Sequence, residues 1–323
     1  MMMIVLMLVG GLLLLWLGGE GFVRGSVGVA RVLGLSPFLI GLTLVGFGTS
    51  LPELVTSISA ALADAPGLAV GNVVGSNIAN VLLILGIGAI ICPIGADPRS
   101  FRSDATVLAI ASMAGAGLIQ FGVISRLAGI MLVAGLVGYL AYVYFRERAQ
   151  TTPAGVVLEH EAEAAEPVPM QWPMALLITV VGLAAVVGGA TLFVEGAVSL
   201  AEWFGVSKTL IGLTLVAVGT SLPELVITII AALRHQMDVV LGNIIGSNLF
   251  NILGIMGITA LVLPIDVPAS LLSIDLAALL VSTTLLIIAA ATKYSVSRGE
   301  GAILLLCYIG YTAYRATTNG AGI

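Results

Sequence analysis

Charged side chains are scarce in this sequence: Asp, Glu, Lys and Arg make up only 9% of its 323 residues. Hydrophobic residues make up 59%, and the mean hydropathy of +1.16 is far above that of soluble globular domains. The apolar runs are continuous, as in Val81 to Ile91, and therefore lack the alternating polarity of a membrane β-barrel. The composition predicts an all-α integral membrane protein.

Sulfur and imidazole are also nearly missing. Cys92 and Cys307 lie far apart in apolar surroundings, so we expect small buried side chains without a redox role. His160 and His235 lie in polar stretches and are expected to be solvated. The net charge of -5 comes mostly from one acidic stretch and does not indicate a nucleic-acid partner.

Ten apolar segments are long enough to cross a bilayer as helices. They cover 3–29, 37–62, 70–92, 104–121, 126–146, 173–201, 208–233, 240–263, 271–291 and 299–316. The only long polar stretch follows the fifth segment. It is rich in Glu, Ala and Pro and is predicted to be a flexible linker over 148–172.

The chain is a duplicated unit. IGLTLVGFGTSLPEL at Ile40 returns as IGLTLVAVGTSLPEL at Ile211, and GNVVGSNIANVLLILG at Gly71 returns as GNIIGSNLFNILGIMG at Gly242, both 171 residues later. One shift that serves both motifs indicates a repeat longer than the motifs. We therefore predict a five-helix repeat over 1–147, the linker, and a second five-helix repeat over 173–323.

Five spans in each half are an odd number, so the second half must enter the membrane from the opposite side. The repeats are therefore expected to be inverted. Lys and Arg collect on cytoplasmic loops, and a cytoplasmic linker with both termini outside places nine of the 12 basic residues inside. Those nine are Arg24, Arg31, Arg99, Arg102, Arg146, Arg148, Arg234, Lys293 and Arg298. A multi-pass protein of the cell (inner or plasma) membrane is predicted.

The two GTSLPEL motifs place a proline and a carboxylate inside apolar spans. Pro52 and Pro223 cannot donate an amide hydrogen bond, so carbonyls one turn earlier lose their helical partners and can face an ion. Broken helices at matching positions of inverted repeats are typical of secondary transporters, whose site lies near the bilayer midplane. We therefore predict broken second and seventh helices and an ion site between them.

Polar residues recur at helical spacing around the breaks. Thr49 and Glu53 are four apart and share a helix face, and the same spacing holds for three further pairs. Those pairs are Thr220 with Glu224, Ser76 with Asn80, and Ser247 with Asn251. Such a set supplies only oxygen ligands, which suit calcium and also sodium. A protonated structural glutamate, and serines or asparagines that only join helices, remain alternatives.

These motifs resemble the α-repeats of the cation/calcium exchanger superfamily, and the chain resembles its prokaryotic-type sodium/calcium exchanger branch over nearly its full length. The resemblance implies that calcium is bound by Glu53 and Glu224 with the carbonyls of Thr49 and Thr220. It implies that sodium and the cavity lining use the same glutamates and a further set of residues: Ser50, Ser76, Asn80, Ser221, Ser247, Asn251 and the carbonyls of Gly46 and Ala217. Long first and sixth helices would slide to expose either side.

The sequence departs from some relatives at Asn251, where potassium-dependent exchangers have an aspartate. The amide argues against a potassium requirement and makes the middle position a poorer sodium site. The linker is too short for a regulatory domain, so allosteric calcium regulation of that kind is not expected.

The predicted function is secondary antiport of sodium against calcium by alternating access, with the sodium gradient driving calcium extrusion. A proton/calcium antiporter is the nearest alternative, because a midplane glutamate can also be neutralised by a proton. A cation channel and an intramembrane hydrolase fit the broken repeats less well. We expect a monomer in the lipid bilayer, no enzyme activity and no cofactor, with calcium and sodium as the transported ions.

Overall fold

The computed structural model describes residues 1–95, 98–150, 171–204, 217–267 and 274–320, and these are almost entirely helical. The first half contains α1 (Met2–Leu33), α2 (Pro37–Ile40), η1 (Gly41–Val45), α3 (Gly46–Thr49), α4 (Leu51–Leu62), α5 (Pro66–Ala79), η2 (Asn80–Leu85), α6 (Gly86–Ile91), α7 (Pro98–Gln120) and α8 (Arg126–Gln150). The second half contains α10 (Trp172–Trp203), α12 (Ala217–Thr220), α13 (Leu222–Leu233), α14 (Met237–Leu249), η4 (Phe250–Ile255), α15 (Met256–Val262), α16 (Ile274–Lys293) and α17 (Arg298–Gly320).

The long helices make this a multi-pass membrane protein. Within the described ranges, six helices are long and apolar enough to cross a bilayer, and a bent pair over 37–62 raises the number to seven. Two shorter apolar helices, Leu222–Leu233 and Ile274–Ala289, overlap further predicted segments. The arrangement of ten spans therefore stays a prediction. Most of the predicted linker lies outside the described residues, between Gln150 and Gln171.

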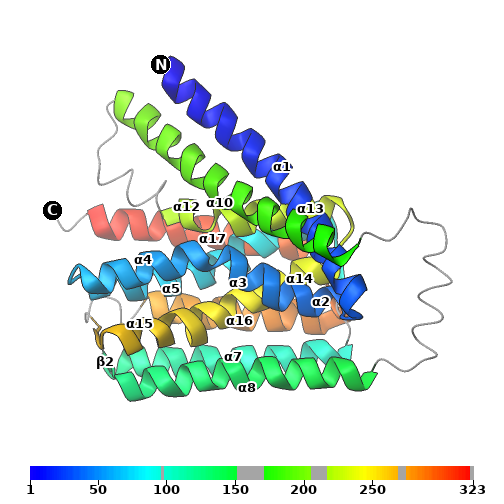
Figure 1. Ribbon diagram of the computed structural model, residues 1–323. Helices are drawn as coiled ribbons and strands as arrows, with labels where there is room; N and C mark the ends of the chain where they lie inside the picture. The colour runs from blue at the N-terminus through cyan, green and yellow to red at the C-terminus, as the bar shows by residue number, and fades with distance from the viewer. Residues whose placement is uncertain (96–97, 151–170, 205–216, 268–273, 321–323) are drawn as a thin grey trace.

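Two of the longest helices, α1 and α10, lie side by side and cross the rest of the bundle obliquely (Figure 1). Glycines on both helices allow their backbones to touch. A Cβ atom on Gly18 would lie 2.8 Å from the amide nitrogen of Val186, and one on Gly182 would lie 2.5 Å from that of Phe22. Only glycine permits such a close approach, so the two helices pack as one long pair.

The second predicted span is broken as the sequence indicates. α3 ends at Thr49 and α4 begins at Leu51, with a bend of 41° between the two parts of the span. Ser50 at the break has φ -83° and ψ 4°, and Ser221 in the second half has φ -88° and ψ 7°. Pro52 and Pro223 follow each break in the first turn of the new helix, where the missing N–H costs nothing.

The core of the bundle surrounds α14. All residues of α14 from Val239 to Leu249 are buried, which is expected of a helix enclosed by protein on all sides. α14 continues into the π-helical turn η4, and α5 continues likewise into η2, which begins at Asn80. Spacing arguments did not predict these π-turns. Such turns occur frequently at functional sites.

Four two-residue strands join the halves at the ends of the bundle. β1 (Ile94–Gly95) pairs antiparallel with β4 (Ser295–Val296), and β2 (Val123–Ile124) pairs antiparallel with β3 (Ile265–Asp266). β1 and β2 flank α7, whereas β3 and β4 flank α16. The start of α7 therefore lies at the end of α16, and these two equivalent helices run in opposite directions.

The expectation that both cysteines are buried is wrong. Cys92 is half-buried at the end of α6, and Cys307 is exposed on α17. An apolar residue position on a membrane helix can face lipid as readily as it can face the core, so apolar surroundings in the sequence do not distinguish the two cases.

Candidate cation-binding site

Two buried glutamates begin the helices that follow the breaks. Glu53 lies in the first turn of α4 and is 1% exposed, and Glu224 lies in the first turn of α13 and is 2% exposed. The N-terminus of a helix favours negative charge because its first N–H groups are unpaired. The break therefore places each carboxylate where a helix end supports it, inside the bundle.

The two halves exchange hydroxyl contacts at these glutamates. Ser221 Oγ donates to Glu53 Oε1 at 3.4 Å, and Ser50 Oγ donates to Glu224 Oε1 at 3.4 Å. Each serine sits at the break of one half and reaches the carboxylate of the other half. The structure therefore brings both glutamates, Ser50 and Ser221 together.

Each carboxylate retains an unsatisfied oxygen. Glu53 Oε2 and Glu224 Oε2 are buried and have no hydrogen-bond partner among the described residues. The side-chain oxygens of Asn80 and Asn251 are also buried and have no hydrogen-bond partner among the described residues. Buried oxygens of this kind are costly unless a cation or a proton satisfies them. Their number and type fit an oxygen-lined cation site.

Backbone and hydroxyl oxygens of the first break meet the second half. Ser247 Oγ on α14 donates to the carbonyl of Gly46 at 3.5 Å, and Ser221 Oγ lies 3.5 Å from Ser76 Oγ. The hydroxyl of Thr49, at the end of α3, donates to the carbonyl of Val45 at 3.0 Å. The predicted positions 46, 49, 76 and 247 therefore belong to the same cluster.

Four further predicted site residues lie at the π-turns and at the second break. Asn80 and Asn251 are each 1% exposed and lie in the π-turns η2 and η4. Thr220 is half-buried and directly precedes Ser221, and Ala217 begins α12 three residues earlier. The part of this span before Ala217 lies outside the described residues.

Two asparagines that our sequence reasoning did not single out connect the site to its surroundings. Asn72 Nδ2 donates to Ser57 Oγ at 2.9 Å and to the carbonyl of Glu53 at 3.1 Å. Its repeat equivalent, Asn243, donates to Thr228 Oγ1 at 3.2 Å. Both lie in the repeated GN of the second motif, and the hydroxyls follow the glutamates by four residues, so the repeat itself carried the signal.

Asn243 also accepts hydrogen bonds across the halves. Its Oδ1 lies within hydrogen-bond distance of Thr49 Oγ1 at 3.5 Å and of Ser247 Oγ at 3.4 Å, as an acceptor that these hydroxyls share with the carbonyls of Val45 and Gly46. The amide therefore orients residues of both halves around the first break. A positioning role for this asparagine follows, because its bonds fix neighbours and leave the carboxylates free.

Chemically, the site offers hard ligands only. Among the described residues, no group of three or more His, Cys, Asp or Glu side chains is placed to hold a metal ion. Two carboxylates with hydroxyl, amide and carbonyl oxygens suit calcium and sodium and do not suit zinc or copper.

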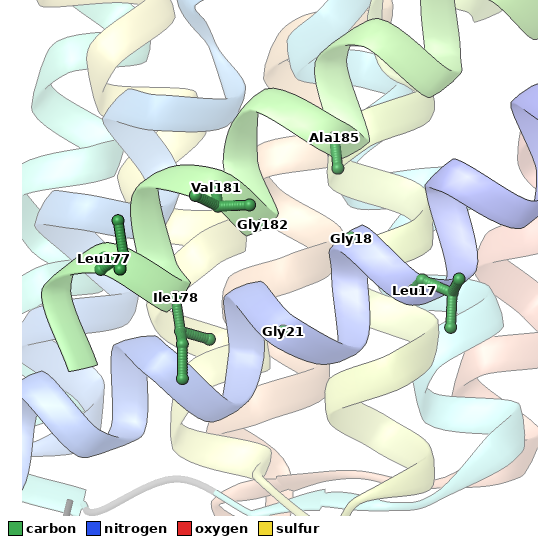
Figure 2. Close-up of a pocket in the computed structure, with 8 residues that line it drawn as sticks. All are labelled: Leu17, Gly18, Gly21, Leu177, Ile178, Val181, Gly182 and Ala185. Atoms are coloured by element: carbon green, nitrogen blue, oxygen red, sulfur yellow. The ribbon is translucent and has the colours of Figure 1, made fainter. Parts of the chain in front are cut away.

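A groove of about 360 Å³ elsewhere in the molecule has the opposite character. It lies between α1 and α10 and is lined only by apolar residues and glycine (Figure 2). Those residues are Leu17, Gly18, Gly21, Leu177, Ile178, Val181, Gly182 and Ala185. It offers no ligand for a cation, in contrast to the buried carboxylates.

Carboxylates buried at symmetric helix breaks in a membrane bundle define the class of secondary cation transporters. The family model described as sodium/calcium exchanger protein matches residues 3–145 and 174–317. The chain belongs to the sodium/calcium exchanger family.

Individual relatives agree with this assignment. The chain is 34% identical over 337 residues to the sodium/calcium exchanger MaX1 of Methanosarcina acetivorans, covering 95% of this chain and 96% of that protein. It is 33% identical over 305 residues to the inner membrane protein YrbG of Escherichia coli, covering 94% of each. A solved structure of the sodium-calcium exchanger NCX_Mj, soaked with Na⁺ and Sr²⁺, matches with a TM-score of 0.83 at 33% identity, over 97% of this chain and 98% of that one. The predicted family resemblance is confirmed.

Proposed function

We propose that the protein is a secondary active antiporter that exchanges sodium for calcium by alternating access, with the sodium gradient driving calcium extrusion. The observation that carries this proposal is the reciprocal contact of each buried glutamate with a serine of the opposite half. Residues of both halves therefore enclose one buried position, and sliding of the long helices α1 and α10 would expose it to one side at a time, as in a transporter rather than a fixed pore.

Two inverted five-helix repeats, over 1–147 and 173–323, are the proposed architecture. The antiparallel pairing of β1 with β4 and of β2 with β3 supports it, because the equivalent helices α7 and α16 then run in opposite directions. Ten spans, a cytoplasmic linker over 148–172 and both termini outside follow from this topology and from the positive-inside rule. A monomer in the cell membrane is sufficient, since one chain supplies both halves of the site.

Calcium is proposed to bind between Glu53 and Glu224 with the carbonyls of Thr49 and Thr220. The unbonded Oε2 atom of each glutamate supports this assignment. Sodium would use the same glutamates with the oxygens of a second group: Ser50, Ser76, Asn80, Ser221, Ser247, Asn251, and the carbonyls of Gly46 and Ala217. Because the ions share ligands, they exclude each other, and this competition couples their movement.

The empty site carries two carboxylates without a compensating cation. Moving uncompensated charge through a low-dielectric interior is costly, so the empty transporter should resist the conformational change and suppress leak. The hydroxyl groups beside each carboxylate favour sodium over a proton as the counter-ion, because a proton needs no such cage. Membership of the sodium/calcium exchanger family also favours sodium over a proton as the coupled ion.

Calcium-45 uptake into proteoliposomes tests the proposal. We expect uptake when sodium is loaded inside, and no comparable uptake with an outward proton gradient of the same size. Glu53→Gln and Glu224→Gln should each abolish sodium-driven uptake, whereas Glu202→Gln, an isosteric change on an exposed residue of α10, should leave it unchanged. Uptake driven only by protons would contradict sodium coupling. Uptake that persists in both glutamate variants would contradict the assignment of Glu53 and Glu224 as ion ligands.

A further inference from the structure

One thiol and one imidazole of the two halves meet outside the cation site. Cys92 Sγ, at the end of α6, lies 3.4 Å from His235 Nδ1, in the turn between α13 and α14. The chain has only two cysteines and two histidines, and this contact uses one of each. His235 is exposed and Cys92 is half-buried, so the pair is accessible from solvent.

The backbone holds both residues in place. Cys92 ends α6 in an extended conformation, and its N–H donates to the carbonyl of Gly88 at 3.0 Å. His235 has φ 56°, and the N–H of Gln236 donates to the carbonyl of Ala231 at 2.9 Å. This is the left-handed cap of a helix end, which fixes the turn. The preceding residue, Arg234, is ion-paired with Glu20 of α1.

The separation of the two atoms matches that required by a shared metal ion. Zinc binds cysteine sulfur at about 2.3 Å and histidine nitrogen at about 2.0–2.1 Å with tetrahedral geometry, which places the two ligand atoms about 3.6 Å apart. The observed Sγ to Nδ1 distance is 3.4 Å. A shift of a few tenths of an ångström would therefore admit the ion.

We propose that Cys92 and His235 form a binding site for a zinc-class divalent cation, Zn²⁺ or Cd²⁺, with water completing the coordination. Thiolate and imidazole select such ions, whereas calcium and sodium prefer oxygen. The site is therefore separate in chemistry from the transport site. With two protein ligands it is weaker than a structural zinc site, which has four.

A bound ion would join parts of the molecule that belong to different halves. α6 belongs to the first half, while the turn bearing His235 follows α13, which carries Glu224 in its first turn. Cys92 lies two residues before β1, and the carbonyl of its neighbour Ile91 accepts from Arg298 at 3.4 Å. Because Arg234, next to His235, is paired with Glu20 of α1, an ion that fixes this turn should also slow the sliding of α1, and hence exchange.

Binding is tested on the purified full-length protein in detergent by titration with Cd²⁺, with the ultraviolet thiolate-to-cadmium absorption as the readout. We expect saturable absorption that is lost in Cys92→Ser and an affinity reduced by roughly tenfold or more in His235→Gln. The chain supplies matched controls: Cys307→Ser and His160→Gln should bind as the original protein does. No absorption, or an unchanged affinity in His235→Gln, would show that the contact is only a hydrogen bond and would overturn the proposal.

Transport gives an independent readout for the same site. We expect Zn²⁺ to slow sodium-driven calcium uptake in the original protein and in Cys307→Ser, and to lose this effect in Cys92→Ser. Inhibition that persists in Cys92→Ser and is relieved by calcium would mean that zinc acts at the glutamates, which overturns the bridge. Because the absorption assay needs no transport, failure of the antiport proposal would leave the binding result interpretable.

Discussion

Glu53 and Glu224 each accept one serine hydroxyl from the opposite half at 3.4 Å, so the two halves are equivalent where they touch the carboxylates. The two halves differ at the asparagines that lie behind the glutamates. Asn72 is half-buried and donates to the carbonyl of Glu53, whereas Asn243 is 0% exposed and accepts from hydroxyls of both halves. The proposed ion ligands would be constrained by the ion, whereas the residues behind them are constrained only by their own packing.

The peripheral helices repeat this contrast. Asp104 on α7 is fully buried and receives two hydrogen bonds from Arg146, at 2.9 and 3.2 Å. Its equivalent, Asp275 on α16, pairs with Arg315 at 3.2 Å, and the Arg315 side chain is 28% exposed. Each half therefore ties its buried aspartate to an arginine of its last helix, at positions that are not equivalent, and solvent reaches the second pair more easily.

The largest expected difference between the halves concerns these two aspartates. Asp104→Asn leaves Arg146 buried without its carboxylate, which costs about 3–5 kcal/mol of the free energy of unfolding. Asp275→Asn should cost less, about 1–2 kcal/mol, because Arg315 can turn toward water. Thermal denaturation in detergent, followed by intrinsic tryptophan fluorescence, compares the two variants directly.

Tyrosine changes provide the control for this comparison. Tyr139→Phe and Tyr311→Phe each remove one neutral hydroxyl, which donates to the aspartate at 3.0 Å and 2.8 Å respectively. Each should cost only about 1 kcal/mol. Equal losses for the two aspartate variants would contradict the assigned difference in burial.

Asn243→Ala and Asn72→Ala test the layer directly behind the glutamates. Asn243→Ala removes the partner of three buried hydroxyl groups, on Thr49, Ser247 and Thr228. We expect a loss of about 2–3 kcal/mol, against about 1 kcal/mol for Asn72→Ala, whose site is partly open to solvent. Chemical denaturation of both variants measures the difference, and a larger loss for Asn72→Ala would reverse the comparison.

Much of the site could be predicted from the sequence because duplication marks it. Glu53 and Glu224 stand out as charges inside apolar runs, and the proline after each break explains why the helix ends there. The break at Ser50 and the meeting of the two halves at the glutamates follow from these residues. Six of the helices are also long and apolar enough to be recognised as spans without any structure.

Other features could not be predicted from one sequence. The π-turn at Asn80 depends on tertiary packing, because its residues have no composition that separates π from α geometry. The cross-half bonds of Asn243 require knowledge of which helix faces which. Cys92 and His235 are 143 residues apart, and only the fold brings them together. Contacts between distant segments carry no local signal in the chain.

Ser50→Ala and Ser221→Ala should affect transport equally, because they remove equivalent contacts. Each contact is long, at 3.4 Å, and involves a charged acceptor. We expect the calcium concentration for half-maximal uptake to rise by about threefold to tenfold in each variant, which corresponds to about 1 kcal/mol. Calcium-45 uptake at varied calcium measures both, with Ser297→Ala, outside the site, as the control. A difference of more than tenfold between the two serines would break the equivalence of the halves.

The smallest expected effect comes from an ion pair that only one half possesses. Arg234, at the end of α13, pairs with Glu20 of α1, whereas the equivalent positions are Ala63 and Thr191 and cannot form it. The pair is solvent-exposed, so it is worth at most about 1 kcal/mol. Because it ties α1 to α13 at one face only, its loss should change the ratio of exchange rates in the two directions.

Arg234→Gln and Glu20→Gln are each expected to shift that ratio by up to about fivefold, and the shift should shrink at high salt. The measurement is calcium-45 exchange in vesicles of defined orientation, with sodium loaded on either side. The double change Glu20→Arg with Arg234→Glu restores an ion pair of reversed polarity, so it should return the ratio toward its original value. If both single changes leave the ratio unaltered, the two faces are energetically equivalent despite their different residues, and the asymmetry of the periphery has no influence on the direction of exchange.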